Sequence, residues 1–338
     1  MAAQKRAPVT AQDLHGVTYL RLLGPLLDHL HTAGTERDRA GNRQLFYEQY
    51  ATVLLRYFFS PIVTRLRALQ QAPTVAKVQH RCGLRPTSLG ALSEAAQVFD
   101  AALLHAVIEE VGRCIPSPAV ATERAALQAL TAVDGRRLPA LPKMAWARWQ
   151  DDQQRAAKMH VAFEVLRQLP VGGTVTAGNA SERSEWRHLV QPGGCYVVDR
   201  GSADDELLPD LHDRPCRFMA RGQYKAAYEV QEERPGSAAA QAAGGRRACL
   251  IRRLGTAHHS HLLPQPFRVV RVASGKTKAD GTPDLRVLVT NQLDLDAELV
   301  ALAYRFRWAV ERCFRWLKCV LGCRHLLSQS AKGVRIQV

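Results

Sequence analysis

The first 125 residues carry apolar side chains at the spacing of helices. From Ser88 onward, apolar residues recur at three- and four-residue steps, namely at Leu92, Ala96, Phe99, Leu103 and Ala106. An earlier segment, residues 45–69, is rich in Leu, Tyr and Phe and is interrupted at Pro61. These patterns predict an N-terminal helical domain over residues 1–125. Such a domain could bind DNA, but packing alone also accounts for the pattern.

From about residue 128 the pattern changes to short apolar runs typical of strands. The candidate strands are residues 127–133, 159–166, 171–177 and 195–198, and residues 181–190 are expected to form a helix. Ser202, with Asp205 three residues later, resembles a capping box that opens another helix. Strands that alternate with helices in this way indicate a mixed α/β layer.

Residues 211–290 read as strands separated by turns, and a long helix follows them. The expected strands are residues 218–220, 227–230, 248–254, 267–273 and 285–290. Between them, the Ala- and Gly-rich stretch 235–245 is expected to be a flexible loop. From Asp294 to about Leu321 the sequence predicts one continuous helix.

The charge of the chain is lopsided and concentrated. The sequence has 46 Lys and Arg against 31 Asp and Glu, a net charge of +15. Residues 211–284 hold 13 basic against 6 acidic side chains, and residues 301–338 hold 8 against 1. A concentrated basic excess suits a polyanion-binding surface. The alternative is a soluble protein that merely has a high isoelectric point.

Neither a secretory signal nor a membrane span is expected. Residues 1–16 lack an apolar core, and the apolar run 51–63 is short and broken by Arg56. The cysteines contain no C-x-x-C pair, which fits reduced thiols in a cytoplasmic protein. They are Cys82, Cys114, Cys195, Cys216, Cys249, Cys313, Cys319 and Cys323.

Two groups of residues raise the question of zinc. Cys319, Cys323 and His325 lie close together in sequence, but no fourth ligand is near, so thiols on a helical face are the expected explanation. His258, His259 and His261 are expected to be solvated histidines of a loop.

The sharpest chemical signal is Tyr304-x2-Arg307-x3-Glu311-x6-Lys318, on the last predicted helix. At helical spacing these four side chains share a stripe about 60° wide. An adjoining apolar strip comprises Phe306, Val310, Phe314 and Leu317. A carboxylate between two cations suits a metal ligand, with the cations placed to grip phosphates. The alternative is an ordinary salt-bridged helix.

This pattern resembles the signature of the IS-four family of bacterial insertion-sequence transposases, members of the DDE group. Further matches follow in the right order. Val133-Asp134-Gly135 resembles the segment with the first catalytic aspartate, and Tyr196-Val197-Val198-Asp199-Arg200-Gly201 the segment with the second. Lys158-Met159-His160, Phe163 and Pro170 are similar to the stretch after the first aspartate, and residues 288–291 to the strand before the signature helix.

The resemblance implies an α/β fold with an RNase H-like mixed sheet. Residues 126–210 would form the first part of this catalytic core, and residues 285–338 the second part. Residues 211–284 would be a basic, β-rich insertion. The 112 residues from Asp199 to Glu311 already exceed what a strand and a helix need.

The resemblance also implies a reaction and a site. Asp134, Asp199 and Glu311 would hold two Mg²⁺ ions about 4 Å apart, with Mn²⁺ as a substitute. The enzyme would cut double-stranded DNA at terminal inverted repeats and join the ends to target DNA, as a homodimer on DNA. Tyr304, Arg307 and Lys318 would contact the phosphates.

Each aspartate also has a plainer explanation. Asp134-Gly135 is a common hairpin turn, and Asp199 could simply end a strand. Asp204 and Asp205 could merely favour the start of a helix. Asp151 and Asp152 are alternative acids in a polar stretch.

Two features depart from the family pattern. Relatives that form hairpins use an aromatic residue of the insertion to hold a flipped base, but this insertion has no Trp; Phe218, Tyr224, Tyr228 and Phe267 are the available aromatic residues. The chain also stops at Val338, where relatives continue with apolar helix, so a C-terminally truncated copy is expected. Two alternatives therefore stay open: an inactive DNA-binding or inhibitory derivative, and a nuclease that cannot join ends.

Overall fold

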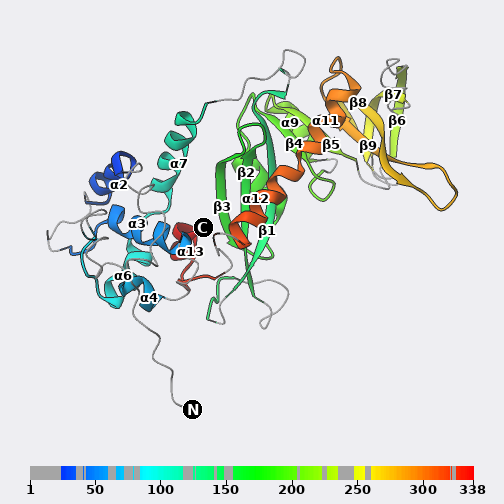
Figure 1. Cartoon of the computed structure of the whole chain (residues 1–338). Helices are drawn as coiled ribbons and strands as arrows, with labels where there is room; N and C mark the ends of the chain where they lie inside the picture. The colour runs from blue at the N-terminus through cyan, green and yellow to red at the C-terminus, as the bar shows by residue number, and fades with distance from the viewer. Residues whose placement is uncertain are drawn as a thin grey trace.

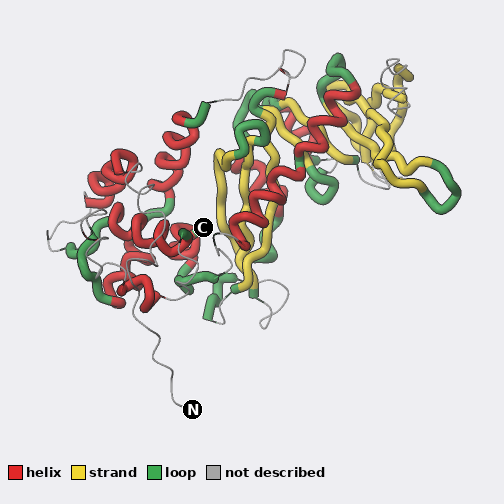
Figure 2. Tube along the Cα trace, in the orientation of Figure 1, coloured by secondary structure: helices red, strands yellow, loops and turns green. Residues whose placement is uncertain are grey.

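A helical lobe lies beside a large mixed sheet in the computed structural model (Figures 1 and 2). The structure describes residues 24–35, 41, 43–59, 66–71, 79, 84–116, 125, 127–140, 143–147, 155–203, 206–222, 227–234, 247–255, 260–319, 321 and 325–338. Pro61, Asp151, Asp152, Asp204, Asp205, Tyr224, His258, His259, Cys82, Cys323 and the stretch 235–245 lie outside these residues.

The first five strands form the centre of the fold. They are β1 (Leu130–Pro139), β2 (Ala156–Glu164), β3 (Leu169–Ala177), β4 (Cys195–Val198) and β5 (Arg217–Arg221). β3, β2 and β1 pair in antiparallel fashion, and β4 and β5 then continue the sheet parallel to β1. This order, with helices on both faces, confirms the predicted α/β fold with an RNase H-like mixed sheet.

Strand β1 runs straight through the Asp134-Gly135 pair. Asp134 lies opposite Val161 of β2, and Gly135 lies opposite His160. The hairpin-turn alternative for this pair is therefore wrong. The dipeptide alone favoured a turn, but nine consecutive pairings with β2 hold the strand extended as far as Pro139.

Helices cover the two faces of the sheet. Helices α8 (Glu182–Leu189) and α9 (Leu207–Asp213) pack on one face, where Trp186 and Leu208 share a core with Val133 and Val198. Helices α11 (Ala297–Phe306) and α12 (Trp308–Cys319) pack on the other face with Ala132, Val161 and Val197. Residues that alternate along β1 and β4 thus face opposite layers.

The remaining strands extend the same sheet beyond β5. They are β6 (Ala227–Arg234), β7 (Arg247–Gly255), β8 (Ser260–Thr277) and β9 (Pro283–Thr290), in the spatial order β5-β9-β8-β7-β6. All pairs in this sheet extension are antiparallel, and its far end projects away from the helical lobe (Figure 1). The segment predicted as an insertion, 211–284, therefore contributes strands to the central sheet.

The predicted last helix is broken at Arg307. The Arg307 N–H bonds to the carbonyl of Tyr304, and the Val310 N–H bonds to the carbonyl of Arg307. These three-residue spacings tighten the backbone into a 3₁₀-like turn between α11 and α12. The prediction of one continuous helix is wrong at this residue.

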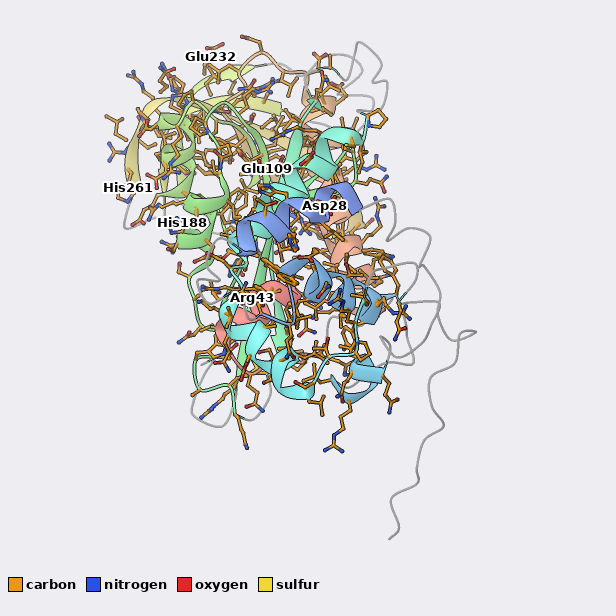
Figure 3. The ribbon with its side chains drawn as sticks, turned by 90° about the vertical axis from the view of Figure 1, so that its left-hand side faces the viewer. Asp28, Arg43, Glu109, His188, Glu232 and His261 are labelled. Atoms are coloured by element: carbon orange, nitrogen blue, oxygen red, sulfur yellow. The ribbon has the colours of Figure 1, made fainter. Side chains whose placement is uncertain are left out.

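The helical lobe consists of α2 (Gly24–Thr35), α3 (Tyr47–Phe58), α4 (Leu66–Gln71), α6 (Leu89–Val98) and α7 (Ala102–Cys114). The Ser88 hydroxyl accepts a bond from the Ala91 N–H and begins α6, where the predicted helical pattern starts. That pattern was expected to continue to Ala106, but it is broken between α6 and α7, which are bent by 83°. The Tyr47 ring stacks on Phe99 in the core, whereas Asp28 of α2 and Glu109 of α7 are exposed (Figure 3). The predicted helix start at Ser202 is wrong: α9 starts at Leu207, and its N-cap residue, Glu206, makes no side-chain capping hydrogen bond.

The C-terminal helix α13 (Ala331–Gln337) joins the lobe to the sheet. Ile336 belongs to the core of the lobe, while Val334 belongs to the core on the α11–α12 face. The hydroxyl of Tyr57 in α3 also donates to the carbonyl of His325.

Among the described helices, none taken alone has the length and apolar composition needed to cross a membrane. The pair α6 and α7 meets that test only when taken together, and the two are bent by 83°.

Candidate active site

The strand register brings Asp134 and Asp199 to the same edge of the sheet. β1 pairs with β4 from Leu130 opposite Cys195 to Ala132 opposite Val197, so the same offset aligns Asp134 with Asp199 just beyond. The carboxyl ends of parallel strands meet at one edge, which is where sites in such sheets form. The Gly135 N–H donates to Oδ1 of Asp134 at 2.8 Å.

Asp199 is held by the turn that follows β4 and by Tyr304. The N–H groups of Ser202 and Ala203 donate to the main-chain carbonyl of Asp199. The Tyr304 hydroxyl, from α11, donates to Oδ1 of Asp199 at 2.9 Å. A helix on one face of the sheet therefore fixes the carboxylate of the second aspartate.

The guanidinium of Arg307 lies among all three predicted acids. It donates to Glu311 at 2.8 Å and lies 3.5 Å from Asp199 and 4.0 Å from Asp134. The Arg307 side chain is 9% exposed, whereas its three acid partners are partly exposed, so water still reaches the carboxylates. The break between α11 and α12 occurs at Arg307 itself, between the helix that carries Tyr304 and the helix that carries Glu311.

Lys318 lies further along α12. Its ammonium group donates to the main-chain carbonyl of Arg137 on β1 at 2.7 Å. The structure thus brings together five of the six residues singled out in the sequence, and it places the sixth against the strand that carries Asp134.

Charge and burial shift the pKa values in this site. Burial raises the pKa of Asp134 to about 6; the Gly135 N–H and Arg307 oppose this rise, while Glu182 and Asp199 add to it. Burial acts to lower the pKa of Arg307, but Asp199 and Glu311 outweigh it and the pKa is raised. Burial, together with Asp199, raises the pKa of Tyr304. The pKa shifts of Asp134 and Arg307 thus reflect the same arrangement, in which the carboxylates lie close together around the Arg307 guanidinium.

Sequence reasoning missed several residues beside these acids. Lys158 of β2 forms an ion pair with Glu182 at 2.7 Å, and the Ser202 hydroxyl donates to the other oxygen of Glu182. Trp308 is 55% exposed, and the Arg307 guanidinium lies 5.1 Å from the centre of its ring. The match to Lys158-Met159-His160 was the one signal that pointed to Lys158.

The donor set fits Mg²⁺ in its chemistry, because three carboxylates offer the hard oxygen ligands that this ion takes. In the described part of the chain, no three His, Cys, Asp or Glu side chains are spaced to hold a metal ion directly. The acids share Arg307 instead, so bringing them onto a common ion requires its guanidinium to move aside. Of the three residues considered for zinc, Cys319 and His325 are described, and Cys323 lies outside the described residues.

Comparison with known proteins gives a consistent picture. The family model described as "Transposase DDE domain" matches residues 126–338. The chain is 26% identical to a putative transposase, y4zB, of Sinorhizobium fredii over 222 residues, which are 64% of this chain and 59% of that protein. It is 25% identical to a probable transposase for insertion sequence element IS5377 of Geobacillus stearothermophilus over 196 residues, 58% of this chain and 49% of that protein.

The alignments thus span between about half and three-fifths of the length of these curated relatives. Among solved structures, the chain has a distant likeness to a piggyBac transposase synaptic complex with hairpin DNA. The TM-score is 0.44 at 7% identity, over 98% of this chain and 76% of that chain.

Proposed function

Since this chain belongs to the family of transposases with a DDE domain, we propose that it cuts the ends of its own mobile element and joins them to target DNA. The observation that carries the proposal is the gathering of Asp134, Asp199 and Glu311 around Arg307. The family match covers the segment in which all three acids lie.

In the proposed reaction, Asp134, Asp199 and Glu311 hold divalent ions, Mg²⁺ with Mn²⁺ as a substitute. When bound, such ions activate an attacking oxygen and stabilise the oxygen that leaves phosphorus. Water is the attacking group in cutting, which frees a 3′-hydroxyl at the end of the element. That hydroxyl then attacks a phosphate of the target and displaces another 3′-oxygen.

The side chains of Arg307, Lys318 and Tyr304 have a separate task. Arg307 can pass its hydrogen bonds from the carboxylates to a phosphate, because a guanidinium binds either group in the same forked geometry. Tyr304 keeps Asp199 in place and, with Lys318, contacts the backbone beside the cut. Two observations support these roles: the side chains are of types that bind phosphate, and they lie beside Asp199 or against the strand that carries Asp134.

Double-stranded DNA is the proposed partner along the sheet extension. Arg252, Lys276 and Lys278 have exposed side chains there, and residues 211–284 carry more than twice as many basic as acidic side chains. These basic side chains would bind the phosphates of both the terminal inverted repeats and the target DNA. Two ends cut in concert require two sites, so we propose a homodimer on DNA.

The test is cleavage of a labelled duplex that carries the element's end, with Mg²⁺, by this chain and by Glu311→Gln. We expect nicking by the parent and none by the variant, because the substitution removes one anionic ligand while keeping the side chain's size. Glu110→Gln, on the exposed side of α7, is the matched control and should cut like the parent.

The remaining outcomes separate the alternatives. Binding of the duplex without cutting by the parent would identify a DNA-binding derivative, and the proposal of an active enzyme would fall. Cutting without joining of a pre-cleaved end would identify a nuclease of the same fold.

A further inference from the structure

A chain of three side chains lies behind the acids, on the opposite face of the sheet. We propose that Lys158, Glu182 and Ser202 form a positioning bridge that sets the spacing between Asp134 and Asp199. None of the three acts on the substrate in this proposal; they act through the strand and the turn that carry the aspartates. The inference rests on the proposed function, since this spacing matters only if the aspartates hold ions together.

The first half of the positioning bridge is an ion pair between β2 and the first turn of α8. Lys158 Nζ lies 2.7 Å from Glu182 Oε1, and the lysine side chain is 9% exposed. A buried ammonium group is costly unless a counter-charge accompanies it, so Lys158 holds Glu182 in one position. Because β2 pairs with β1 along its whole length, this position is fixed relative to Asp134.

The second half connects Glu182 to the turn that carries Asp199. The Ser202 hydroxyl donates to Glu182 Oε2 at 3.1 Å, and Ser202 is buried. The N–H of the same serine donates to the carbonyl of Asp199 at 3.1 Å. Each oxygen of the Glu182 carboxylate thus has its own partner. Oε1 contacts Lys158 of β2, which pairs with the strand of Asp134, and Oε2 accepts from Ser202 in the turn after Asp199.

Gly135 makes this close approach possible. A Cβ atom at this position would lie 2.9 Å from Cε of Lys158 and 3.3 Å from Oε1 of Glu182. Any side chain there would push the ion pair away from the strand. The residue that follows Asp134 therefore has a physical reason to be glycine, because the Lys158–Glu182 pair and His160 together take up the space of a Cβ atom.

The experiment measures Mn²⁺ binding by the full chain, with free Mn²⁺ detected by electron paramagnetic resonance. The variants are Ser202→Ala, Glu182→Gln and the two combined, and thermal unfolding verifies that each is folded. We expect each single variant to bind Mn²⁺ about tenfold more weakly, the typical cost of losing support behind metal ligands. The double variant should lose little more than one single variant, because both changes cut the same bridge.

The matched control is Ser181→Ala, the same change at an exposed neighbouring position without a side-chain cap hydrogen bond, which should bind Mn²⁺ like the parent. Ser202→Ala leaves the Lys158–Glu182 pair intact, so it carries the test if Glu182→Gln does not fold. Unchanged Mn²⁺ affinity in folded variants, or losses that multiply in the double variant, would overturn the positioning bridge. Asp199→Asn separates the two proposals: if the parent binds no more Mn²⁺ than Asp199→Asn, the proposed function fails and the bridge falls with it.

Discussion

The hydroxyl of Tyr304 donates to Oδ1 of Asp199, the same carboxylate oxygen that lies 3.5 Å from the guanidinium of Arg307. One oxygen of the second aspartate is thus contacted by a neutral donor and a cation, which come from consecutive turns of chain at the α11–α12 break. The neutral donor keeps its contact if the cation leaves. In the proposed reaction, Tyr304 would therefore keep Asp199 oriented while Arg307 binds a phosphate.

Replacement of Tyr304 by Phe tests this hydrogen bond. Tyr304→Phe should lower the free energy of unfolding by about 1 kcal/mol, the usual net value of such a bond, because water reaches the partly exposed Asp199 and replaces part of it. Urea unfolding measures the change, and cleavage should slow as Asp199 loses its fixed direction. An unchanged urea midpoint would show that the bond adds nothing net to stability.

The raised pKa of Asp134 predicts a pH-dependent effect of Asp134→Asn in EDTA. In the folded chain this carboxyl has a pKa of about 6, above its ordinary value of 3.8, so its ionisation opposes folding. The penalty is absent below about pH 4, grows between the two pKa values, and is constant above about pH 6. Asp134→Asn should therefore melt higher than the parent at pH 7.5 and level with it near pH 4. A gap that widens toward low pH would contradict the direction of the shift.

The crowding at Gly135 gives a third prediction. Gly135→Ala should destabilise the fold by about 1–3 kcal/mol, because the added methyl group overpacks against Lys158 and His160. Gly201→Ala is the control: a Cβ there meets nothing within 4 Å, so its effect should stay within about 0.5 kcal/mol. Equal unfolding curves for the two variants would show that the strand yields without cost.

Trp308 predicts an effect on DNA without an effect on folding. Its ring is exposed beside Arg307, and an exposed aromatic face can stack on a base for about 1–3 kcal/mol. Trp308→Ala should therefore weaken binding of the element's end about tenfold, with little change in the melting temperature. Trp316→Ala, at an exposed position two turns further along the same helix, is the comparison and should bind closer to the parent. Equal loss in both variants would assign the effect to the whole helix face.

Much of the fold could be predicted from sequence because most of its strands contain a short apolar run, although β8 extends well beyond its run, from Ser260 to Thr277. Residues 195–198 match β4, and the five strands expected after residue 211 are all present. The Asp134-Gly135 pair was ambiguous because a dipeptide carries no information about its partner strand. The break at Arg307 was hidden because the apolar strip keeps its helical spacing across a single 3₁₀-like turn.

The positioning bridge could not be predicted for a different reason. Lys158, Glu182 and Ser202 come from three segments, each separated by about twenty residues from the next, and each is an ordinary polar residue in its own segment. Glu182 reads as an acid in the first turn of a helix, which needs no further explanation. Only the pairing of β1 with both β2 and β4 makes these segments neighbours.

Helix α13 has a consequence for the order of events during synthesis. The bond from Tyr57 to the carbonyl of His325 spans 268 residues, and Ile336 completes the core of the N-terminal lobe. A ribosome adds roughly 5–20 residues per second, so the interval between the synthesis of Tyr57 and that of His325 is on the order of 15–50 s. The core of the lobe that is made first is therefore completed only when α13 has been made, and its apolar surface stays open to chaperones until then.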